Sequence, residues 1–254
     1  MHHVHALLPV TPASLFARRR GVLVALGILL AAFASAAVLR DGQLLLTWDE
    51  PIQRGVESNR TSALDQFFLT VSRFGSTIPV LSLGALTAAL TWRRCRAVST
   101  AIIVATLARP LLEFTVKVLV DRDRPDFERL VAGNGPSFPS GHVLAAVALW
   151  GLLPVVVSLY THRRTLWWAS VVASGSLILG ISASRIYLGV HWFSDVTAGL
   201  VVGVFFLLGV ELVLRHQHVR YPCALLRPAD RADCEAAQAE PERPESERPP
   251  VLTG

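Results

Sequence analysis

Long apolar runs, several of them closed by arginine-rich turns, constrain this chain more than any other feature. Of its 254 residues, 52% are hydrophobic and 17% are charged, which is too apolar for an ordinary soluble domain. A helix needs about 20 apolar residues to cross the hydrocarbon core of a bilayer, and helices satisfy their own backbone hydrogen bonds there. The sequence therefore predicts an all-α fold, a polytopic bundle of membrane helices.

About six transmembrane helices are expected from the lengths of these runs. Their predicted positions are residues 21–39, 76–92, 98–120, 143–160, 166–183 and 192–214. Residues 64–74 predict an amphipathic helix at the membrane interface before the second span. The first run has an alternative interpretation as a signal peptide, since the small residues at 34–36 suit cleavage. In either case the segment that follows leaves the cytoplasm.

The domain that these spans form covers residues 21–215. Residues 1–20 precede it and are predicted to be a cytoplasmic N-terminal segment. Residues 216–254 follow it as a cytoplasmic tail, which from residue 227 onwards is rich in Pro, Glu, Ala and Arg. Almost no large apolar side chains accompany them, so the tail cannot bury enough apolar surface to fold. A disordered C-terminal tail is expected.

The basic residues indicate how the chain is oriented. A net charge of +5 would suit nucleic-acid binding, but the arginines gather at the ends of the apolar runs, as the positive-inside rule requires. Counting from 18–20, the basic turns at 93–96 and 162–164 fall on the cytoplasmic side. We expect a multi-pass protein of the inner (plasma) membrane whose partners are membrane lipids and not nucleic acid. No oligomeric state is predicted.

The cysteines predict neither a metal site nor a disulfide framework. The chain has three of them, Cys95, Cys223 and Cys234, and they lie far apart without metal-ligand spacing. An odd number is also unfavourable for complete pairing. No metal is therefore expected.

Charged residues occur inside the third predicted span. Arg109, Glu113 and Lys117 are spaced four residues apart and so share one helix face. Ionisable groups within a span usually face a polar cavity or one another. Arg109 and Glu113 therefore either pair with each other or line a site. Lys117 is the only lysine in the chain and indicates a position that suits a compact ammonium group.

The first of three polar clusters begins at this lysine. Lys117 and Arg124 lie seven positions apart across the predicted helix end, so two cations can converge on one anion from helix and loop. Arg122 is a further, spare cation in this interpretation. Asp121 and Asp123 are candidates to hold the arginines in place.

The second cluster, Pro139-Ser140-Gly141-His142, opens the fourth predicted span. Ser140 suits the N-cap of the helix, and Gly141 lets a ligand approach the backbone closely. The unpaired N–H groups at a helix start favour an anion, and His142 in the first turn is aimed at it. A generic turn with a capping serine is the alternative interpretation.

The third cluster joins the fifth and sixth predicted spans. Ser184-Arg185 ends one, while His191 and Asp195 lie four residues apart at the start of the other. Asp195 can accept one ring N–H of His191 and leave the other nitrogen free, which is the arrangement of an oriented nucleophile. Arg185 supplies a third cation. The alternative is a salt bridge that staples the helix ends.

Together, and on one predicted membrane face, these clusters resemble the signature of the type-2 phosphatidic acid phosphatase superfamily. That signature is Lys, six residues, Arg-Pro; Pro-Ser-Gly-His; and Ser-Arg, five residues, His, three residues, Asp, and every position matches. The resemblance implies phosphate contacts from Lys117, Arg124, Ser140, Gly141 and Arg185. It also implies that His142 is the general acid, His191 the nucleophile and Asp195 its orienting partner.

The function implied by this resemblance is metal-independent hydrolysis of a lipid phosphate or diphosphate at the outer leaflet, through a phosphohistidine intermediate and without a cofactor. Candidate substrates are undecaprenyl diphosphate, phosphatidylglycerol phosphate and phosphatidate. A lipid phosphotransferase on the same scaffold is one alternative, and a non-catalytic bundle that binds an anion or lipid is another. The non-catalytic alternative does not account for His142, His191 and Asp195, since anion binding alone requires neither a nucleophile nor an acid.

Overall fold

The computed structural model describes residue 27 and residues 43–93, 95–160 and 163–220 of the chain. The predicted N-terminal segment 1–20, nearly all of the first predicted span and the tail beyond residue 220 lie outside this part. The choice between a first span and a signal peptide, and the disorder predicted for the tail, therefore concern residues that the structure does not describe.

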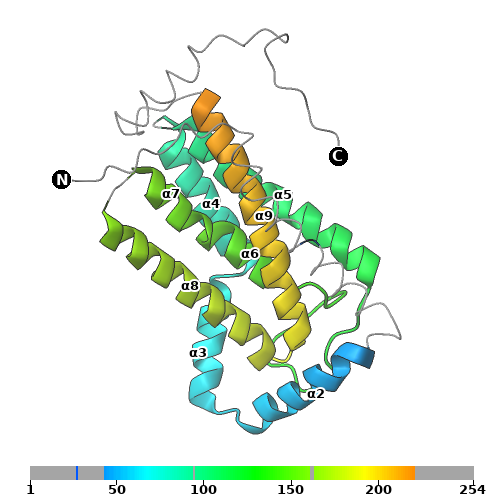
Figure 1. Ribbon diagram of the computed structural model, residues 1–254. Coiled ribbons are helices and arrows are strands. Elements are labelled where there is room, and N and C mark those ends of the chain that lie inside the picture. The colour runs from blue at the N-terminus through cyan, green and yellow to red at the C-terminus, as the bar shows by residue number, and fades with distance from the viewer. Residues whose placement is uncertain (1–26, 28–42, 94, 161–162, 221–254) are drawn as a thin grey trace, which may run out of the picture.

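Helices make up the regular structure of the described residues (Figure 1). Their bounds are α2 Gln43–Ser58, α3 Ser62–Arg73, α4 Thr77–Trp92, α5 Arg96–Val120, α6 Gly141–Trp150, α7 Leu152–Tyr160, α8 Arg164–Tyr187 and α9 Phe193–Arg220. The predicted interfacial helix is α3, and the second, third and fifth predicted spans are α4, α5 and α8. The fourth is divided at Gly151 into α6 and α7.

Two elements differ from the predicted layout. α9 continues to Arg220, past the predicted domain boundary at residue 215. α2 lies in a mixed segment for which no helix was predicted, and it includes Pro51 within its length. Its composition is too polar for a membrane span, but its polar and apolar residues lie on separate faces about as clearly as those of α3, so the sequence did contain a helix signal that was missed.

Three helical segments are long and apolar enough to cross a membrane: Gly141–Ser158, Arg164–Tyr187 and Phe193–Leu214. A fourth arises if α3 and α4, which meet at a bend of 42°, count as one broken span. The 25-residue α5, which carries Arg109, Glu113 and Lys117, is not among them. The all-helical bundle of a membrane-integral protein is thus confirmed, whereas the number of six spans stays a prediction.

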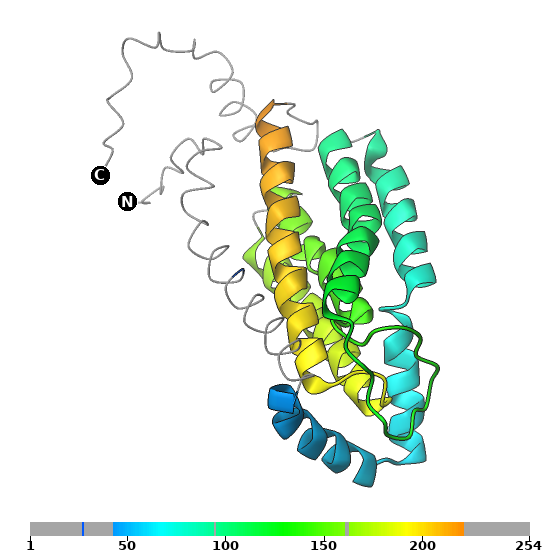
Figure 2. The same cartoon turned by 90° about the vertical axis from the view of Figure 1, so that its right-hand side faces the viewer.

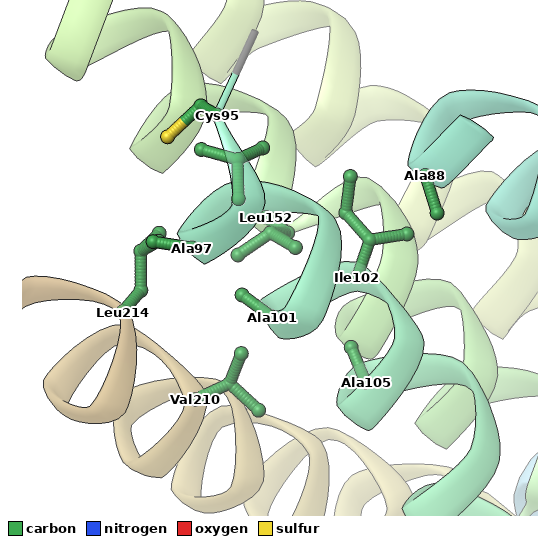
Figure 3. Close-up of a cluster of buried hydrophobic side chains, with 10 residues drawn as sticks. Ala88, Cys95, Ala97, Ala101, Ile102, Ala105, Leu152, Val210 and Leu214 are labelled. Carbon is green, nitrogen blue, oxygen red and sulfur yellow. The ribbon is translucent and has the colours of Figure 1, made fainter. Parts of the chain in front are cut away.

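One end of the bundle is packed with small and branched apolar side chains. α5 packs against both α4 and α9, and Figure 3 shows Ala97 and Ala101 of α5 close to Leu214 and Val210 of α9. Small side chains let helices approach closely, and close van der Waals packing drives helix association in lipid. We call this cluster the apolar end; its buried members are Ala88, Cys95, Ala97, Val98, Ala101, Ile102, Ala105, Leu152, Val210 and Leu214.

Cys95 corrects one expectation from the sequence. It is buried in the apolar end and is disulfide-bonded, a bond that was not expected from three scattered cysteines. An odd count excludes complete pairing but not a single bond between two of three cysteines. Distance along the chain is also a weak guide, because a helical bundle brings remote segments together.

The polar clusters lie at the other end of the bundle, which we call the site end. There α2 runs across the bundle (Figures 1 and 2), and residues of α3 and of the connection 121–140 pack against the same apolar cluster. α5 stops at Asp121, whose φ of 42° is left-handed, a conformation that aspartate tolerates better than most residues. The turn from α8 to α9 uses Gly189 at φ 74°, where a side chain would meet the Glu128 carbonyl.

Candidate active site

A pocket of about 200 Å³ opens at the site end. Six of the eight predicted site residues line it: Lys117, Arg124, Gly141, His142, Arg185 and His191. The other two, Ser140 and Asp195, are fully buried behind this lining. Residues that the motifs did not identify complete the wall, namely Gly75, Thr77, Arg109, Glu113, Ala132, Gly133 and Asn134. The structure therefore brings all three sequence clusters to one place.

The charged face of α5 forms one wall of the pocket. Lys117 Nζ lies 2.9 Å from Glu113 Oε1, and the other oxygen of Glu113 accepts a hydrogen bond from Arg109. Arg109 also donates to the Gly141 carbonyl at 3.3 Å. Both interpretations of this face are correct, because the charges pair with one another and also line the site. The pocket thus holds one carboxylate among its cations.

Backbone carbonyl groups fix the second cation, Arg124, in place. Its guanidinium donates to the carbonyl oxygens of Val190 at 2.7 Å, Gly135 at 2.9 Å and Asn134 at 2.9 Å. Arg124 Nη1 also lies 3.4 Å from His191 Nε2. The carbonyls hold the guanidinium without neutralising it, so its charge remains available to an anion beside His191.

The N-cap of α6 differs from the one predicted for the second cluster. Ser140 is the N-cap residue, but its side chain makes no capping hydrogen bond. Its Oγ is buried and lacks a hydrogen-bond partner in the described part of the chain. The expectation of a side-chain cap is therefore wrong. The backbone N–H of Ser140 instead donates to the Asp195 carbonyl at 3.1 Å, which ties α6 to α9.

Gly141 is required by the close approach of α5. A Cβ at this position would overlap the carboxylate of Glu113. Only glycine lets α5 and the start of α6 come this close. The next residue, His142, lines the pocket from the first turn of α6.

Arg185 reaches the pocket from the last turn of α8. It is 5% exposed, and its Nη1 donates a hydrogen bond to Ser72 Oγ of α3. Its Nε is buried without a partner among the described residues. Nothing in the motifs pointed to Ser72, because the contact joins segments 113 positions apart.

His191 and Asp195 are adjacent, as predicted, but do not form the predicted hydrogen bond. His191 Nδ1 lies 3.6 Å from Asp195 Oδ2, which is too long for one. Asp195 Oδ2 accepts instead from the backbone N–H of Trp192 at 2.9 Å. Burial lowers the pKa of His191 from 6.5 to about 4, with the nearby cations Arg124 and Arg185 acting in the same direction. Its imidazole is consequently neutral at neutral pH.

Arg122 is not the spare cation that the sequence suggested. It is buried, 6% exposed, and pairs with Asp195 at 2.7 Å and with Asp49 of α2 at 2.8 Å. The residues expected to hold the arginines were Asp121 and Asp123, so for Arg122 that prediction is wrong. The connection runs outward at both aspartates while Arg122 points into the protein, as their exposure shows.

The described residues at the site end form no cluster of metal ligands. Across residues 43–93, 95–160 and 163–220, no three side chains of His, Cys, Asp or Glu are placed to hold a metal ion. The charged and titratable groups that face the pocket are cations, two imidazoles and the Glu113 carboxylate. Such a lining suits an anion that carries several negative charges.

Comparison with known proteins agrees with this arrangement. Residues 98–218 match the model of the PAP2 superfamily. Phosphatidylglycerophosphatase B of Bacillus subtilis (strain 168) is 32% identical over 105 residues, which cover 39% of this chain and 50% of that protein. Glucose-6-phosphatase 3 of Bos taurus is 34% identical over 74 residues, which cover 28% of this chain and 21% of that protein. The chain thus spans half of one relative and about a fifth of the other.

Solved structures share the fold. The crystal structure of a transmembrane PAP2-type phosphatidylglycerolphosphate phosphatase from Bacillus subtilis superposes with a TM-score of 0.68 at 24% identity, covering 74% of this chain and 93% of that one. LpxE of Aquifex aeolicus gives a TM-score of 0.51 at 22% identity, with 64% and 93% covered. The family match contains all three motif clusters, and the fold extends well beyond it. Residues 98–218 of this chain thus belong to the PAP2 superfamily, the type-2 phosphatidic acid phosphatases.

Proposed function

We propose that this protein is a phosphatase that removes phosphate from a membrane lipid. The observation that carries the proposal is the lining of one pocket by three cations, Lys117, Arg124 and Arg185, together with His142 and His191. Phosphoryl transfer needs positive charge around the phosphate oxygens, a nucleophile and a proton for the leaving oxygen. Side chains of these kinds meet all three needs. The relatives named as phosphatases support the same chemistry.

The reaction proceeds in two steps. Nε2 of neutral His191 attacks phosphorus, the bond from phosphorus to the lipid oxygen breaks, and His142 gives its proton to that oxygen. Water then attacks the phosphohistidine, His142 takes a proton from the water, and the P–N bond breaks to release inorganic phosphate. The first step needs the His191 tautomer with its proton on Nδ1. Asp195 Oδ2 lies 3.6 Å from that atom and favours this tautomer.

The remaining predicted residues bind the phosphate oxygens. The unpaired hydroxyl of Ser140 and the N–H groups that open α6 are donors at a helix start, where an anion is favoured. Lys117 Nζ and Glu113 Oε1 are 2.9 Å apart, so a phosphate competes with this carboxylate for the lysine. Arg109, which also holds Glu113, keeps the carboxylate in place when the lysine turns to the phosphate.

The lipid is proposed to reach the pocket from the outer leaflet. The pocket lies at the C-terminal end of α5 and α8, whereas the arginine-rich turns begin both helices. Basic turns are retained in the cytoplasm, so the pocket faces the opposite side of an inner membrane. Among the candidate substrates, phosphatidylglycerol phosphate has the support of the Bacillus relative's name.

A phosphate-release assay tests the function. The purified full chain in detergent micelles is given phosphatidylglycerol phosphate, phosphatidate or undecaprenyl diphosphate, with His191→Ala as the inactive control. Release of inorganic phosphate from one of these lipids, absent in the control, is the expected result. The same assay with an added alcohol acceptor distinguishes hydrolysis from transfer, since transfer lowers phosphate release as the acceptor rises. No release above the control from any of the three would overturn the proposal.

Site-directed labelling tests the leaflet. Asp126 lies exposed in the connection 121–140, and Thr165 is exposed at the start of α8. In a chain whose native cysteines are replaced by serine, Asp126→Cys should react with a membrane-impermeant thiol reagent in intact cells. Thr165→Cys, the matched control, should react only after the cells are permeabilised. The reverse pattern would place the pocket on the cytoplasmic side.

A further inference from the structure

A buried network of ionic hydrogen bonds lies directly behind Asp195. Arg122 Nη1 donates to Asp195 Oδ1 at 2.7 Å and to Ser194 Oγ at 2.7 Å, and its Nη2 donates to Asp49 Oδ2 at 2.8 Å. Asp49 Oδ1 also accepts the backbone N–H of Ser194 at 2.9 Å. Asp49 and Asp195 are 1% and 0% exposed. These groups do not line the pocket that holds His191, and the reaction proposed for that pocket makes no use of Arg122 or Asp49.

The network determines how the Asp195 carboxylate faces His191. Oδ1 is held by the Arg122 guanidinium and Oδ2 by the backbone N–H of Trp192. With both oxygens held, the carboxylate cannot rotate, and Oδ2 stays on the side of His191 Nδ1 at 3.6 Å. The Arg122 guanidinium is fixed in turn, since its Nη2 is paired with Asp49 and its Cζ lies over the Trp192 ring, 5.6 Å from the ring centroid.

The charges of the network explain why two carboxylates are present. If Arg122 were paired only with Asp195, the pair would have no net charge. A neutral pair would do little to stabilise positive charge on His191. Asp49 adds a second negative charge, so that one guanidinium and two carboxylates retain one negative charge in a buried setting. Electrostatic interactions are strong in such a setting because water is excluded.

We propose that Arg122 and Asp49 are positioning residues that hold Asp195 as an oriented carboxylate and leave one net negative charge to stabilise His191 as it bonds to phosphorus. This inference rests on the proposed function for the role of His191. Asp49 belongs to α2, which lies outside the segment 98–218 that matches the family. α2 therefore completes the site from behind, although no residue of that helix lines the pocket.

A purely structural role is the alternative, in which the network only docks α2 onto α9. Both roles predict some loss of folded protein when a member is replaced. Only the positioning role predicts that His191 senses the charge of each member. Besides the network, the charged or titratable groups that act on His191 are Asp195 of α9, Arg124 of the connection, Arg185 of α8 and His142 of α6. All four are left unchanged in the test.

The test compares two variants whose charge changes have opposite signs. Asp49→Asn removes a negative charge and should lower the titration midpoint of His191. Arg122→Gln removes a positive charge and should raise it. The titration midpoint of His191 should shift by about half to one pH unit, because the altered charges act on it through Asp195 and do not contact it. The midpoint is followed by NMR on histidine-labelled full chain in micelles, with the His191 signal identified by its loss in His191→Ala.

Activity supplies the second measurement. Asp49→Asn should lower kcat/KM for phosphate release about 10- to 100-fold with little change in KM, because a misplaced orienting group slows the chemical step. In a profile of kcat/KM against pH, the acid limb of Asp49→Asn should move to lower pH. The acid limb of Arg122→Gln should move to higher pH. Asp49→Glu, which restores the charge, should recover part of the activity.

Glu50→Gln is the matched control. It removes the same charge from the adjacent position of α2, where Glu50 pairs with Arg54 at the surface, and it should leave the midpoint and kcat/KM unchanged. If Arg122→Gln does not fold, the shift of the His191 titration midpoint in Asp49→Asn is sufficient to test the inference. An unmoved His191 midpoint in a folded Asp49→Asn variant would overturn the inference, whether or not the protein hydrolyses lipids. A wild-type chain without activity but with the expected shifts would overturn only the proposed function.

Discussion

The two ends of the bundle are equally well buried but contain opposite kinds of side chain. At the apolar end Ala101 and Val210 are 2% and 5% exposed, and at the site end Asp195 and Arg122 are 0% and 6% exposed. Both ends are built largely from the same helices, α5 and α9. An apolar contact stabilises through close packing, whereas a buried ion carries a desolvation cost that its partners must offset.

This difference separates stability from function along the length of the bundle. A protein that needed only to fold could continue the apolar packing of α5 and α9 through to the site end. Instead it keeps Arg122 and Asp195 buried there with a partner for each. Substitutions at the site end should therefore reduce turnover far more than stability. Substitutions at the apolar end should do the reverse, and each prediction below challenges that division.

The largest effect is expected at the nucleophile. His191→Ala should lower kcat/KM for lipid phosphate by about 10⁴-fold or more, because it removes the group proposed to form the covalent intermediate. Its thermal unfolding midpoint should stay within a few degrees of wild type. Phosphate release and circular dichroism on the same preparation measure both. Near-normal turnover would remove His191 from the role of nucleophile.

His142→Ala comes second, with an expected loss of about 10²- to 10³-fold on lipid phosphate. The loss should be much smaller on an aryl phosphate ester with a good leaving group, since such an oxygen departs with little help from a proton. Parallel assays on the two substrates give the ratio. Equal losses on both would mean that His142 binds phosphate and does not protonate the leaving group.

The sequence predicted the helices at the site end well because their signals are local. Apolar runs located α4, α5 and α8 within a few residues, and they located the start of α9, which continues six residues beyond its predicted end. Three spaced motifs identified six residues that line one pocket. Each motif lies at a helix end, where a short pattern determines both the local backbone and the side chains that it presents.

The residues that sequence reasoning missed share a physical cause. Asp49 and Ser72 act through partners more than 70 positions away, Arg122 and Arg185. No local periodicity distinguishes a buried aspartate on an amphipathic helix from an exposed one. Arg122 was misjudged for the same reason, since its neighbours Asp121 and Asp123 were nearer in sequence than its true partners. Asp49 and Gln53 lie four residues apart and are both 1% exposed, so α2 has a buried polar face that becomes visible in the structure.

The third prediction concerns pH. The nucleophile is the neutral form of His191, whose pKa burial lowers from 6.5 to about 4. Activity should thus persist down to about pH 4 and disappear as the pH falls through that value, whereas a histidine of ordinary pKa would be only about 3% neutral at pH 5. The unfolded chain takes up this proton between pH 6.5 and about 4, so acidification through that range also destabilises the fold.

Profiles of kcat/KM against pH, recorded with the aryl ester for wild type and His142→Ala, provide the measurement. The aryl ester makes protonation of the leaving group less important, so the acid limb that both proteins share belongs to His191. An acid limb near pH 6.5 in both would show that burial at the site end does not lower the pKa of His191.

The smallest effect on turnover is expected at the apolar end. Ile102 is 3% exposed within that cluster, and Ile102→Ala leaves a cavity that should cost about 2 kcal/mol, near the lower limit for such changes because lipid surrounds the bundle. The unfolding midpoint should fall by about 5 °C, while kcat/KM per folded molecule stays within about twofold. Ile103→Ala is the matched control, since Ile103 is 37% exposed on the same helix and should change neither quantity. A large fall in kcat for folded Ile102→Ala would show that packing at the apolar end is transmitted along α5 to Lys117, and that the two ends are not separable.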